Sequence, residues 1–291
     1  MNAHRHGWHV DGLPRPAHAL VMGVVNVTPD SFSDGGRYLR SDDAIEHGMM
    51  LARLGADLVD VGGESTRPGA QRPSVEEELD RVLPVVRSLA ARGVAVSVDT
   101  MRAQVAAAAV DAGAVLVNDV SGGKADREML RTVADLGAAY VLMHWRAHSD
   151  RMQQHASYAD VVTDVVAELS AQLDEALAAG IEPARIALDP GIGFSKTSAQ
   201  NWELLAGLEA LHATGHPVLV ATSRKRFLGE LLADGAELRP ALEREDATNA
   251  TTALAAAAGS WCVRVHGVRA AADTVRVVAR WQEAAAQRGP R

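Results

Sequence analysis

Eight short apolar runs recur along this chain, and between them lie stretches long enough for a helix. Eight repeated strand–helix units predict a closed parallel barrel, the single (β/α)8 TIM barrel. The runs lack polar–apolar alternation, as expected for strands that are buried on both faces. The eight runs are Ala19–Asn26, Asp57–Gly63, Ala95–Thr100, Val115–Asp119, Ala139–His144, Arg185–Pro190, Val218–Ser223 and Trp261–His266.

Polar side chains stand at the C-terminal ends of almost all these runs. In a (β/α)8 barrel the C-terminal ends of the strands form the functional face. The same pattern therefore predicts both the fold and the place of the site. The residues at these ends are Asn26, Asp60, Asp99, Asn118, His144, Asp189, Lys225, Arg264 and His266.

Length and charge restrict the class of protein. A chain of 291 residues suits one barrel, predicted for residues 18–291, with residues 1–17 as a loose N-terminal extension. The formal net charge of -8 without a basic stripe argues against nucleic acid and anionic membranes as partners. No apolar stretch approaches the ~20 residues of a membrane helix. The single cysteine, Cys262, cannot form an intrachain disulfide, which fits a cytoplasmic location.

Capping residues predict where several helices begin. Ser74 and Glu77 have capping-box spacing and open a helix that ends near Gly93. A second helix follows Ser41 and stops near Gly55, and a third is expected over about 160–179.

Three connections on the functional face are longer than most strand-to-helix loops. They cover residues 27–41, 63–75 and 145–157. Loops of this length commonly bind or enclose a ligand, so we expect them to take part in the site.

Lysine is rare in this chain, which contains 26 arginines and three lysines. Lys124, Lys196 and Lys225 each lie in a loop just after a strand. A merely solvated Lys225 would place positive charge at the positive N-terminus of the next helix. This conflict favours a functional role for Lys225, whereas Lys124 and Lys196 fit a structural and a functional role equally well.

Amide and carboxylate groups converge at the predicted mouth of the barrel. A single such group could cap a helix, and a buried carboxylate needs a partner in any case. Four together favour a heterocycle with a row of ring N–H donors. Cationic residues and glycines on the opposite side suit a phosphate or diphosphate. The polar row is Asn26, Asp99, Asn118 and Asp189, and the cationic side is Arg67, Arg264 and His266.

Seven ordered motifs give the chain a resemblance to the dihydropteroate synthases, from about residue 18 to the C-terminus. They are Asn26–Gly36, Asp60–Gly69, Ser97–Thr100, Asn118–Gly122, Leu188–Phe194, Ser223–Lys225 and Arg264–His266. The resemblance implies a homodimeric, pterin-binding barrel of folate biosynthesis. Its reaction joins p-aminobenzoate to 6-hydroxymethyl-7,8-dihydropterin diphosphate and releases pyrophosphate.

The resemblance also implies a role for individual residues. Those implied for the pterin ring are Asp99, Asn118, Met143, Asp189 and Lys225. Asn26 would ligate Mg²⁺ on the diphosphate, whose oxygens would be bound by Arg67, Arg264 and His266. The p-aminobenzoate site would be bordered by Thr66, Pro68, Phe194 and Arg226. The residues implied in catalysis are Asp34, Arg67 and Lys225.

The physics of the implied reaction agrees with this residue set. Loss of pyrophosphate leaves a methylene cation conjugated with the pterin, so the reaction needs neutralisation of the leaving group more than a strong base. The sequence accordingly shows no Ser–His–Asp nucleophile set.

Two positions depart from the family pattern. Ala221 stands at a usual glycine, where its methyl group is expected to crowd the pterin, and Gly267 stands at a usual aspartate. These changes leave open an alternative, a paralogue that binds pterin poorly, has little synthase activity and still binds sulfone- or sulfonamide-like aromatics. A pterin-binding barrel of the corrinoid methyltransferase type is a further alternative. Its cobalamin domain is missing here, and the Thr66–Pro68 and Ser223–Lys225 segments argue against it.

Overall fold

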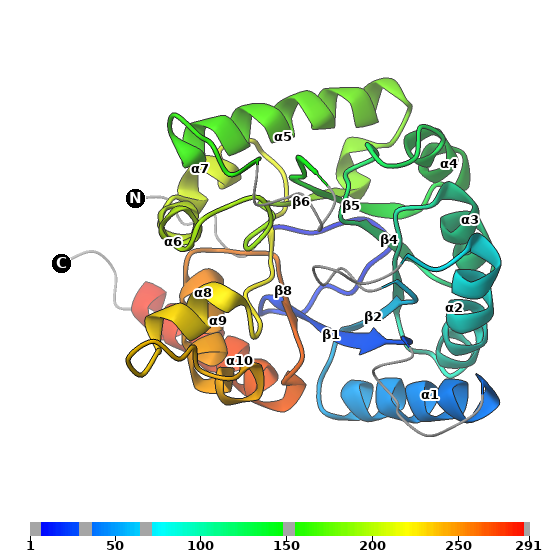
Figure 1. The fold of residues 1–291 in the computed structure, drawn as a ribbon, viewed down its shortest axis with the longest axis horizontal. Coiled ribbons are helices and arrows are strands. Elements are labelled where there is room, and N and C mark those ends of the chain that lie inside the picture. The colour runs from blue at the N-terminus through cyan, green and yellow to red at the C-terminus, as the bar shows by residue number, and fades with distance from the viewer. Residues whose placement is uncertain (1–6, 29–36, 65–71, 148–154, 288–291) are drawn as a thin grey trace.

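The computed structural model describes residues 7–28, 37–64, 72–147 and 155–287. Its strands form one eight-stranded sheet in the order β6-β5-β4-β3-β2-β1-β8-β7, with every paired neighbour parallel. A parallel bridge between Leu188 and Val218 joins the two outermost strands and closes the barrel. The prediction of a single (β/α)8 barrel is confirmed, and Figure 1 shows the helices arranged around the strands.

All eight predicted strands are present, each within two residues of its expected start and three of its expected end. They are β1 (Leu20–Asn26), β2 (Leu58–Gly62), β3 (Val96–Asp99), β4 (Leu116–Asp119), β5 (Ala139–Met143), β6 (Ile186–Asp189), β7 (Leu219–Val220) and β8 (Cys262–Val265).

Ten α-helices and two short 3-10 segments are found in the described part of the chain. The helices are α1 (Arg37–Arg53), α2 (Val75–Ala90), α3 (Ala103–Asp111), α4 (Met129–Leu136), α5 (Val161–Ala178), α6 (Ser198–Ala206), α7 (Leu208–His212), α8 (Arg226–Leu231), α9 (Glu245–Ala257) and α10 (Val268–Gln287). The 3-10 segments are η2 (Pro183–Arg185) and η3 (Ala241–Glu243).

The helix boundaries follow the capping chemistry where a cap exists. The Ser74 hydroxyl accepts from the Glu77 backbone N–H, and the Glu77 carboxylate accepts from the Ser74 backbone N–H, so the predicted capping box is confirmed. Asp160 caps α5 through the Thr163 N–H at 2.7 Å. Helix α1 begins earlier than predicted, at Arg37 instead of after Ser41. No glycine or proline lies between these residues, so nothing in the sequence stops the helix there.

Both faces of the strands are buried, as the missing alternation indicated. On β1, Val21 belongs to the outer core between the strands and the helices. Its neighbours Leu20 and Met22 belong to the inner core, inside the barrel. The inner core fills the barrel below the strand ends that carry the polar residues.

The N-terminal segment differs from the prediction of a loose extension. In its described part, Val10 and Leu13 are 1% and 7% exposed and pack into the inner core. The Asp11 backbone N–H also donates to the Ala184 carbonyl at 2.9 Å. Apolar burial therefore fixes this segment across the N-terminal end of the barrel, where it borders a cavity of about 280 Å³ with Trp261.

The three long loops of the functional face are described only at their ends. Residues 29–36, 65–71 and 148–154 lie outside the described residues. Among the residues that are described, no helix has the length and apolar character needed to cross a membrane.

Candidate active site

Three adjacent strands bring carboxylates and an amide together at the mouth of the barrel. Asp99 on β3 and Asn118 on β4 are direct register partners. The Asn118 amide Nδ2 donates to Asp60 Oδ2 on β2 at 3.0 Å. The predicted convergence of Asp99 and Asn118 is therefore present, and Asp60 joins it.

Arg264 lies among these acids, and not on an opposite cationic side as predicted. Its Nε donates to Asp60 Oδ2 at 2.6 Å, and its Nη2 donates to Asp99 Oδ2 at 2.7 Å. The prediction that Arg264 lies opposite the acids was wrong because only β1 separates β8 from β2. The long Arg264 side chain can therefore reach from β8 to Asp60 on β2. The two carboxylates raise the pKa of the Arg264 guanidinium against the effect of burial, which keeps it charged.

Asp60 is a site residue that the sequence reasoning placed at a strand end but did not assign a role. Its side chain is fully buried, and burial of a charge requires strong partners. Its Oδ2 has two donors, whereas its Oδ1 has no hydrogen-bond partner within the described residues.

Asp189 lies on the other side of the mouth, at the end of β6. Its Oδ1 accepts the Gly191 backbone N–H at 2.7 Å. Burial raises the pKa of the Asp189 carboxyl, while the Lys225 ammonium opposes this shift. Met143 is its register partner on β5, so the sulfur-bearing side chain and the carboxylate come from neighbouring strand ends.

An apolar cluster stands beside the polar groups. Met101, Val120 and Met143 are buried together, and the partly buried Phe194 packs against them. These residues follow or end four successive strands, β3 to β6. A polar row next to an apolar wall suits a flat heterocycle, whose edge needs hydrogen bonds and whose faces need apolar contact.

Lys225 is held above Phe194 at the start of α8. Its Nζ lies 4.9 Å from the centre of the Phe194 ring and donates to the Ile192 carbonyl. Burial lowers the pKa of Lys225 to about 8, and Asp189 counteracts part of this shift. The structure thus brings Lys225, Asp189 and Phe194 into one neighbourhood, as predicted from the motifs.

His266 and Arg226 have different surroundings. The Ser223 hydroxyl lies 2.9 Å from His266 Nδ1 and also accepts the His266 backbone N–H at 3.1 Å. This contact joins the turn after β7 to the end of β8. Arg226 is 76% exposed and donates to Glu230 at 2.7 Å, so it lies at the surface and not inside the cluster.

The turn that carries Lys225 is fixed by residues at the start of α9. Arg224 has a left-handed φ of 59°, an unfavourable conformation for this residue type. Its backbone N–H donates to Thr248, its carbonyl accepts from Arg244, and its guanidinium pairs with Glu245. These contacts hold Lys225 in place against the local strain.

The two departures from the family pattern have structural explanations. Ala221 is 6% exposed and belongs to the inner core, with Leu219 and Met22, so its methyl group is largely packed inside the barrel. At Gly267, an added Cβ would lie 2.8 Å from Glu245 Oε2. The Glu245 carboxylate therefore occupies the space that a side chain at 267 would need.

Asn26 ends β1 at the mouth and is partly exposed. Mg²⁺ keeps several waters and commonly takes one or two protein oxygens together with substrate phosphates, so a single amide oxygen fits this ion. No group of three or more His, Cys, Asp or Glu that could hold a metal occurs in the described part of the chain. Of the remaining predicted site residues, Asp34, Thr66, Arg67 and Pro68 lie outside the described residues.

Known proteins match this chain along almost its whole length. The family model described as pterin binding enzyme matches residues 22–266. A dihydropteroate synthase from Mycobacterium leprae is 55% identical over 274 residues, covering 93% of this chain and 96% of that protein.

Solved structures agree with these matches. A Xanthomonas albilineans dihydropteroate synthase in complex with 7,8-dihydropteroate has a TM-score of 0.81 and 43% identity, covering 94% of this chain and 95% of that one. A Yersinia pestis dihydropteroate synthase with a sulfonamide drug has a TM-score of 0.87 and 39% identity, covering 94% and 98%. With the polar row, the apolar wall and Lys225 in one barrel mouth, the chain belongs to the dihydropteroate synthase family of pterin binding enzymes.

Proposed function

We propose that this chain is a transferase that joins p-aminobenzoate to 6-hydroxymethyl-7,8-dihydropterin diphosphate, forming dihydropteroate and releasing pyrophosphate. The observation that carries the proposal is the row of Asp99, Asn118 and Asp189 beside the buried apolar wall of Met101, Val120 and Met143. The 55% identity to the M. leprae synthase supports the same reaction. It favours an active synthase over a paralogue that binds pterin poorly.

The polar row suits the amino-pyrimidine edge of a pterin. Such an edge presents an amino group and ring N–H donors, which carboxylate and amide oxygens accept. Asp189 and Asn118 stand on opposite sides of β5 and can take two parts of that edge. Lys225, beside Asp189, is a donor for the ring carbonyl or ring nitrogen.

The reaction breaks the bond between the pterin methylene carbon and the diphosphate oxygen, and the amine nitrogen of p-aminobenzoate forms the new bond. Negative charge grows on the leaving diphosphate, positive charge grows on the methylene and ring, and the amine loses one proton to water or to the diphosphate. His266, Arg264 and Arg67 would bind the diphosphate, and the buried carboxylates Asp60 and Asp99 favour the developing cation. Asp34 is proposed to act in the same step.

The p-aminobenzoate is proposed to lie beside Phe194, below the Lys225 ammonium, with Thr66, Pro68 and Arg226 at its border. Phe194 offers an apolar ring face, and Lys225 lies 4.9 Å above that ring. An aromatic carboxylate suits such a pair, because one end is apolar and the other is charged.

Mg²⁺ is proposed as the cofactor, held by Asn26 and by the substrate diphosphate. It would supply positive charge to the leaving group. Asn26→Ala should raise the Mg²⁺ concentration needed for half-maximal rate, whereas an unchanged magnesium dependence would contradict the assignment.

A homodimer is also proposed. Exposed apolar side chains on two packed helices support it, namely Leu254 on α9 at 68% exposure and Val277 and Trp281 on α10 at 65% and 76%. Light scattering at micromolar concentration should give twice the 30.7 kDa chain mass, and Trp281→Asp should reduce it. The chain mass itself for the unaltered protein would contradict a dimer. A cytoplasmic location is proposed because the one cysteine, Cys262, is buried and unpaired.

The experiment that tests the function is a coupled pyrophosphate-release assay with both substrates. The unaltered protein should release pyrophosphate only when both substrates are present, and the product should be dihydropteroate by chromatography. Asp189→Ala is the matched control, because losing a buried hydrogen-bonding partner typically costs ~1–3 kcal/mol of ligand binding. No turnover by the unaltered, folded protein would overturn the proposal.

A further inference from the structure

Lys196 is a buried lysine outside the set of residues that the family resemblance implies. It is 3% exposed, and its Nζ has three acceptors close by. They are the Gly191 carbonyl at 3.1 Å, the Phe194 carbonyl at 3.0 Å and His144 Nδ1 at 3.0 Å. An ammonium has three N–H donors, so each donor has one acceptor.

Two of these acceptors belong to the turn that connects the two halves of the site. This turn runs from Gly191 to Ser195 and is separated from Asp189 by Pro190. Two further side chains donate to the same turn. The Lys225 ammonium donates to the Ile192 carbonyl, and the Tyr158 hydroxyl donates to the Ser195 carbonyl at 3.0 Å. Four carbonyls of this turn thus accept hydrogen bonds, two from Lys196 directly after the turn and two from Lys225 and Tyr158, which are distant in the sequence.

The turn needs this support because it contains strained backbone. Ser195 has a left-handed φ of 50°, which is costly for a residue with a Cβ. Such conformations persist when the surrounding structure determines them from several sides. Lys196 donates to the Phe194 carbonyl and Tyr158 to the Ser195 carbonyl, so the backbone is held on both sides of the strained Ser195 Cα.

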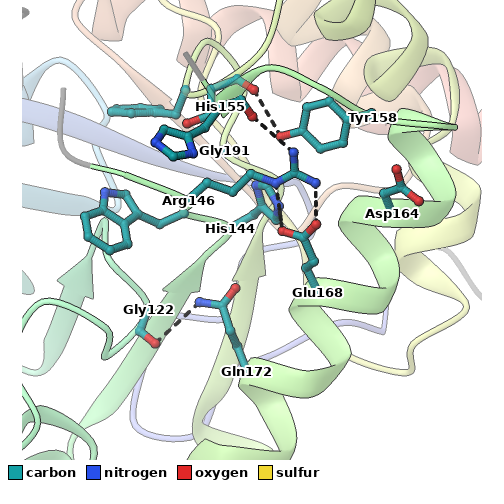
Figure 2. A network of polar contacts seen from close by, with 12 residues as sticks. Gly122, His144, Arg146, His155, Tyr158, Asp164, Glu168, Gln172 and Gly191 are labelled. Carbon is teal, nitrogen blue, oxygen red and sulfur yellow. Dashed lines mark hydrogen bonds and ion pairs between the residues drawn. The ribbon is translucent and has the colours of Figure 1, made fainter. Parts of the chain in front are cut away.

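A chain of polar contacts fixes the orientation of His144, the third acceptor. Its Nε2 lies 2.9 Å from Glu168 Oε2 on α5, and Arg146 holds the same carboxylate at 3.0 Å through Nε (Figure 2). Burial lowers the pKa of Lys196 to about 7, and in its charged form the ammonium can only donate. With that form, His144 accepts at Nδ1 and donates its Nε2–H to Glu168. The Arg146 guanidinium lies 3.7 Å from the centre of the Tyr158 ring, and the Tyr158 hydroxyl donates to the Ser195 carbonyl. This series of contacts therefore leads back to the same turn.

The place suits lysine and excludes arginine. The five N–H donors of a guanidinium lie in one plane. The three acceptors here are instead arranged around the single nitrogen atom Nζ of Lys196. Space is also tight, since a Cβ added at Gly191 would lie 3.4 Å from Lys196 Nζ and 2.5 Å from the His144 carbonyl. This geometry explains a lysine here in a chain that uses arginine almost everywhere else.

We infer that Lys196 is a positioning residue of the reaction, which sets the place of Phe194 and of the Ile192 carbonyl under Lys225, and so governs the p-aminobenzoate half of the site. The inference rests on the proposed function. Asp189 depends less on Lys196, because strand pairing with Met143 and the His144 backbone N–H hold the Asp189 backbone, and no bond joins the Lys196 side chain to Asp189 among the described residues. Lys196 acts on the Asp189 carboxylate only through the Gly191 turn and as a more distant charge than Lys225. The two halves of the site should therefore respond differently when Lys196 is changed.

The test compares Lys196→Met and Lys196→Arg with Lys124→Met in the intact protein. Lys124 is the matched control, since it is an exposed lysine whose side chain makes a single hydrogen bond within the described residues, of 3.4 Å to the Trp145 carbonyl. Values of kcat and of KM for each substrate are measured, together with thermal unfolding. If Lys196→Met does not fold, Lys196→Gln, which keeps one donor, replaces it.

Lys196→Met should raise the KM for p-aminobenzoate about tenfold, because two buried carbonyls lose their donor. The KM for the pterin diphosphate should change by less than roughly threefold. Lys196→Arg should not restore the p-aminobenzoate KM, and Lys124→Met should behave like the unaltered protein. An equal rise in both KM values, or full rescue by Lys196→Arg, would overturn the inference.

Failure of the proposed function is recognised separately. It appears as absence of turnover in the unaltered protein, before any variant is compared. In that case calorimetry replaces kinetics. It compares binding of 7,8-dihydropteroate, which contains the p-aminobenzoate part, with binding of 6-hydroxymethylpterin, which lacks it. Lys196→Met should weaken binding of the first ligand more than of the second, and equal weakening would contradict the inference.

Discussion

The Arg264 guanidinium on the last strand of the barrel lies 2.6 Å from the Asp60 carboxylate on the second strand. The two residues are 204 positions apart in the sequence, and Asp60 is fully buried. The bond links the first and last parts of the chain at the mouth of the barrel. It also makes Arg264 a partner of buried charge as well as a candidate ligand for the diphosphate.

Arg264→Met should therefore reduce stability as well as activity. Removing one partner of a buried ion pair leaves an uncompensated charge, which typically costs about 3 kcal/mol or more. His266→Ala should cost about 1 kcal/mol, the usual contribution of one hydrogen bond such as that to Ser223. Urea denaturation of the three proteins measures both values, and equal stabilities would contradict this role of Arg264.

Ala221→Gly should change pterin affinity by less than roughly threefold, contrary to the crowding that the family pattern suggested. The methyl group packs in the inner core, with Leu219 and Met22. Its removal should lower the free energy of unfolding by about 1 kcal/mol, through lost burial and greater backbone freedom. Calorimetry with a pterin checks the first value. A large gain in affinity would show that the methyl does reach the ligand.

Gly267→Asp should destabilise the protein although the family carries aspartate there. The new side chain would meet the Glu245 carboxylate, which is held by Arg224. Overpacking of this kind typically costs about 1–3 kcal/mol, and the like charges add to it. Adding Glu245→Ala should recover most of the loss, because Arg224 can then pair with the aspartate. Thermal unfolding of the two single variants and the double variant tests this. If the losses of stability in the single variants simply add in the double variant, Arg224 does not pair with the new aspartate.

The stability of the protein should depend on pH through His144. Burial lowers the pKa of His144 to about 4 from its ordinary 6.5. Between these values the unfolded chain binds more protons, so the free energy of unfolding rises with pH by up to about 1.4 kcal/mol per unit. The stabilisation is complete above pH 6.5 and is lost as the pH falls towards 4.

Buried carboxyls such as Asp99 have raised pKa values and titrate with the opposite sign over part of this range. The measurement is therefore the difference in unfolding free energy between the unaltered protein and His144→Gln, followed from pH 4 to 7. This difference should increase with pH up to about 6.5. A difference that stays constant would rule out a buried neutral imidazole.

The strands and their ends could be predicted from the sequence because burial on both faces leaves an unbroken apolar run. Asp99 and Asn118, which end such runs on neighbouring strands, are register partners in the structure. Helix starts were predictable where a side chain caps the helix, as at Ser74. At α1 no such stop exists, so the helix extends back to Arg37.

Contacts between distant parts of the chain could not be predicted in the same way. The sequence shows Arg264 near His266, and only barrel closure places it against Asp60. The burial of Val10 depends likewise on the inner core that the strands create together. The role of Lys196 was left open because one of its three acceptors, His144, lies 52 residues away in the sequence.

The closure of the barrel is uneven. Strand β7 has two residues, and one isolated bridge joins it to β6, whereas β1 and β2 share five register pairs. Asp189 ends β6 and Lys225 follows β7, so the site straddles the junction with the least backbone bonding. A ligand that binds both Asp189 and Lys225 would form an additional connection between β6 and β7. Substrate binding should therefore slow hydrogen exchange at the Leu188 amide, which donates across this junction to the Pro217 carbonyl. The free energy of substrate binding would then stabilise the closed barrel directly.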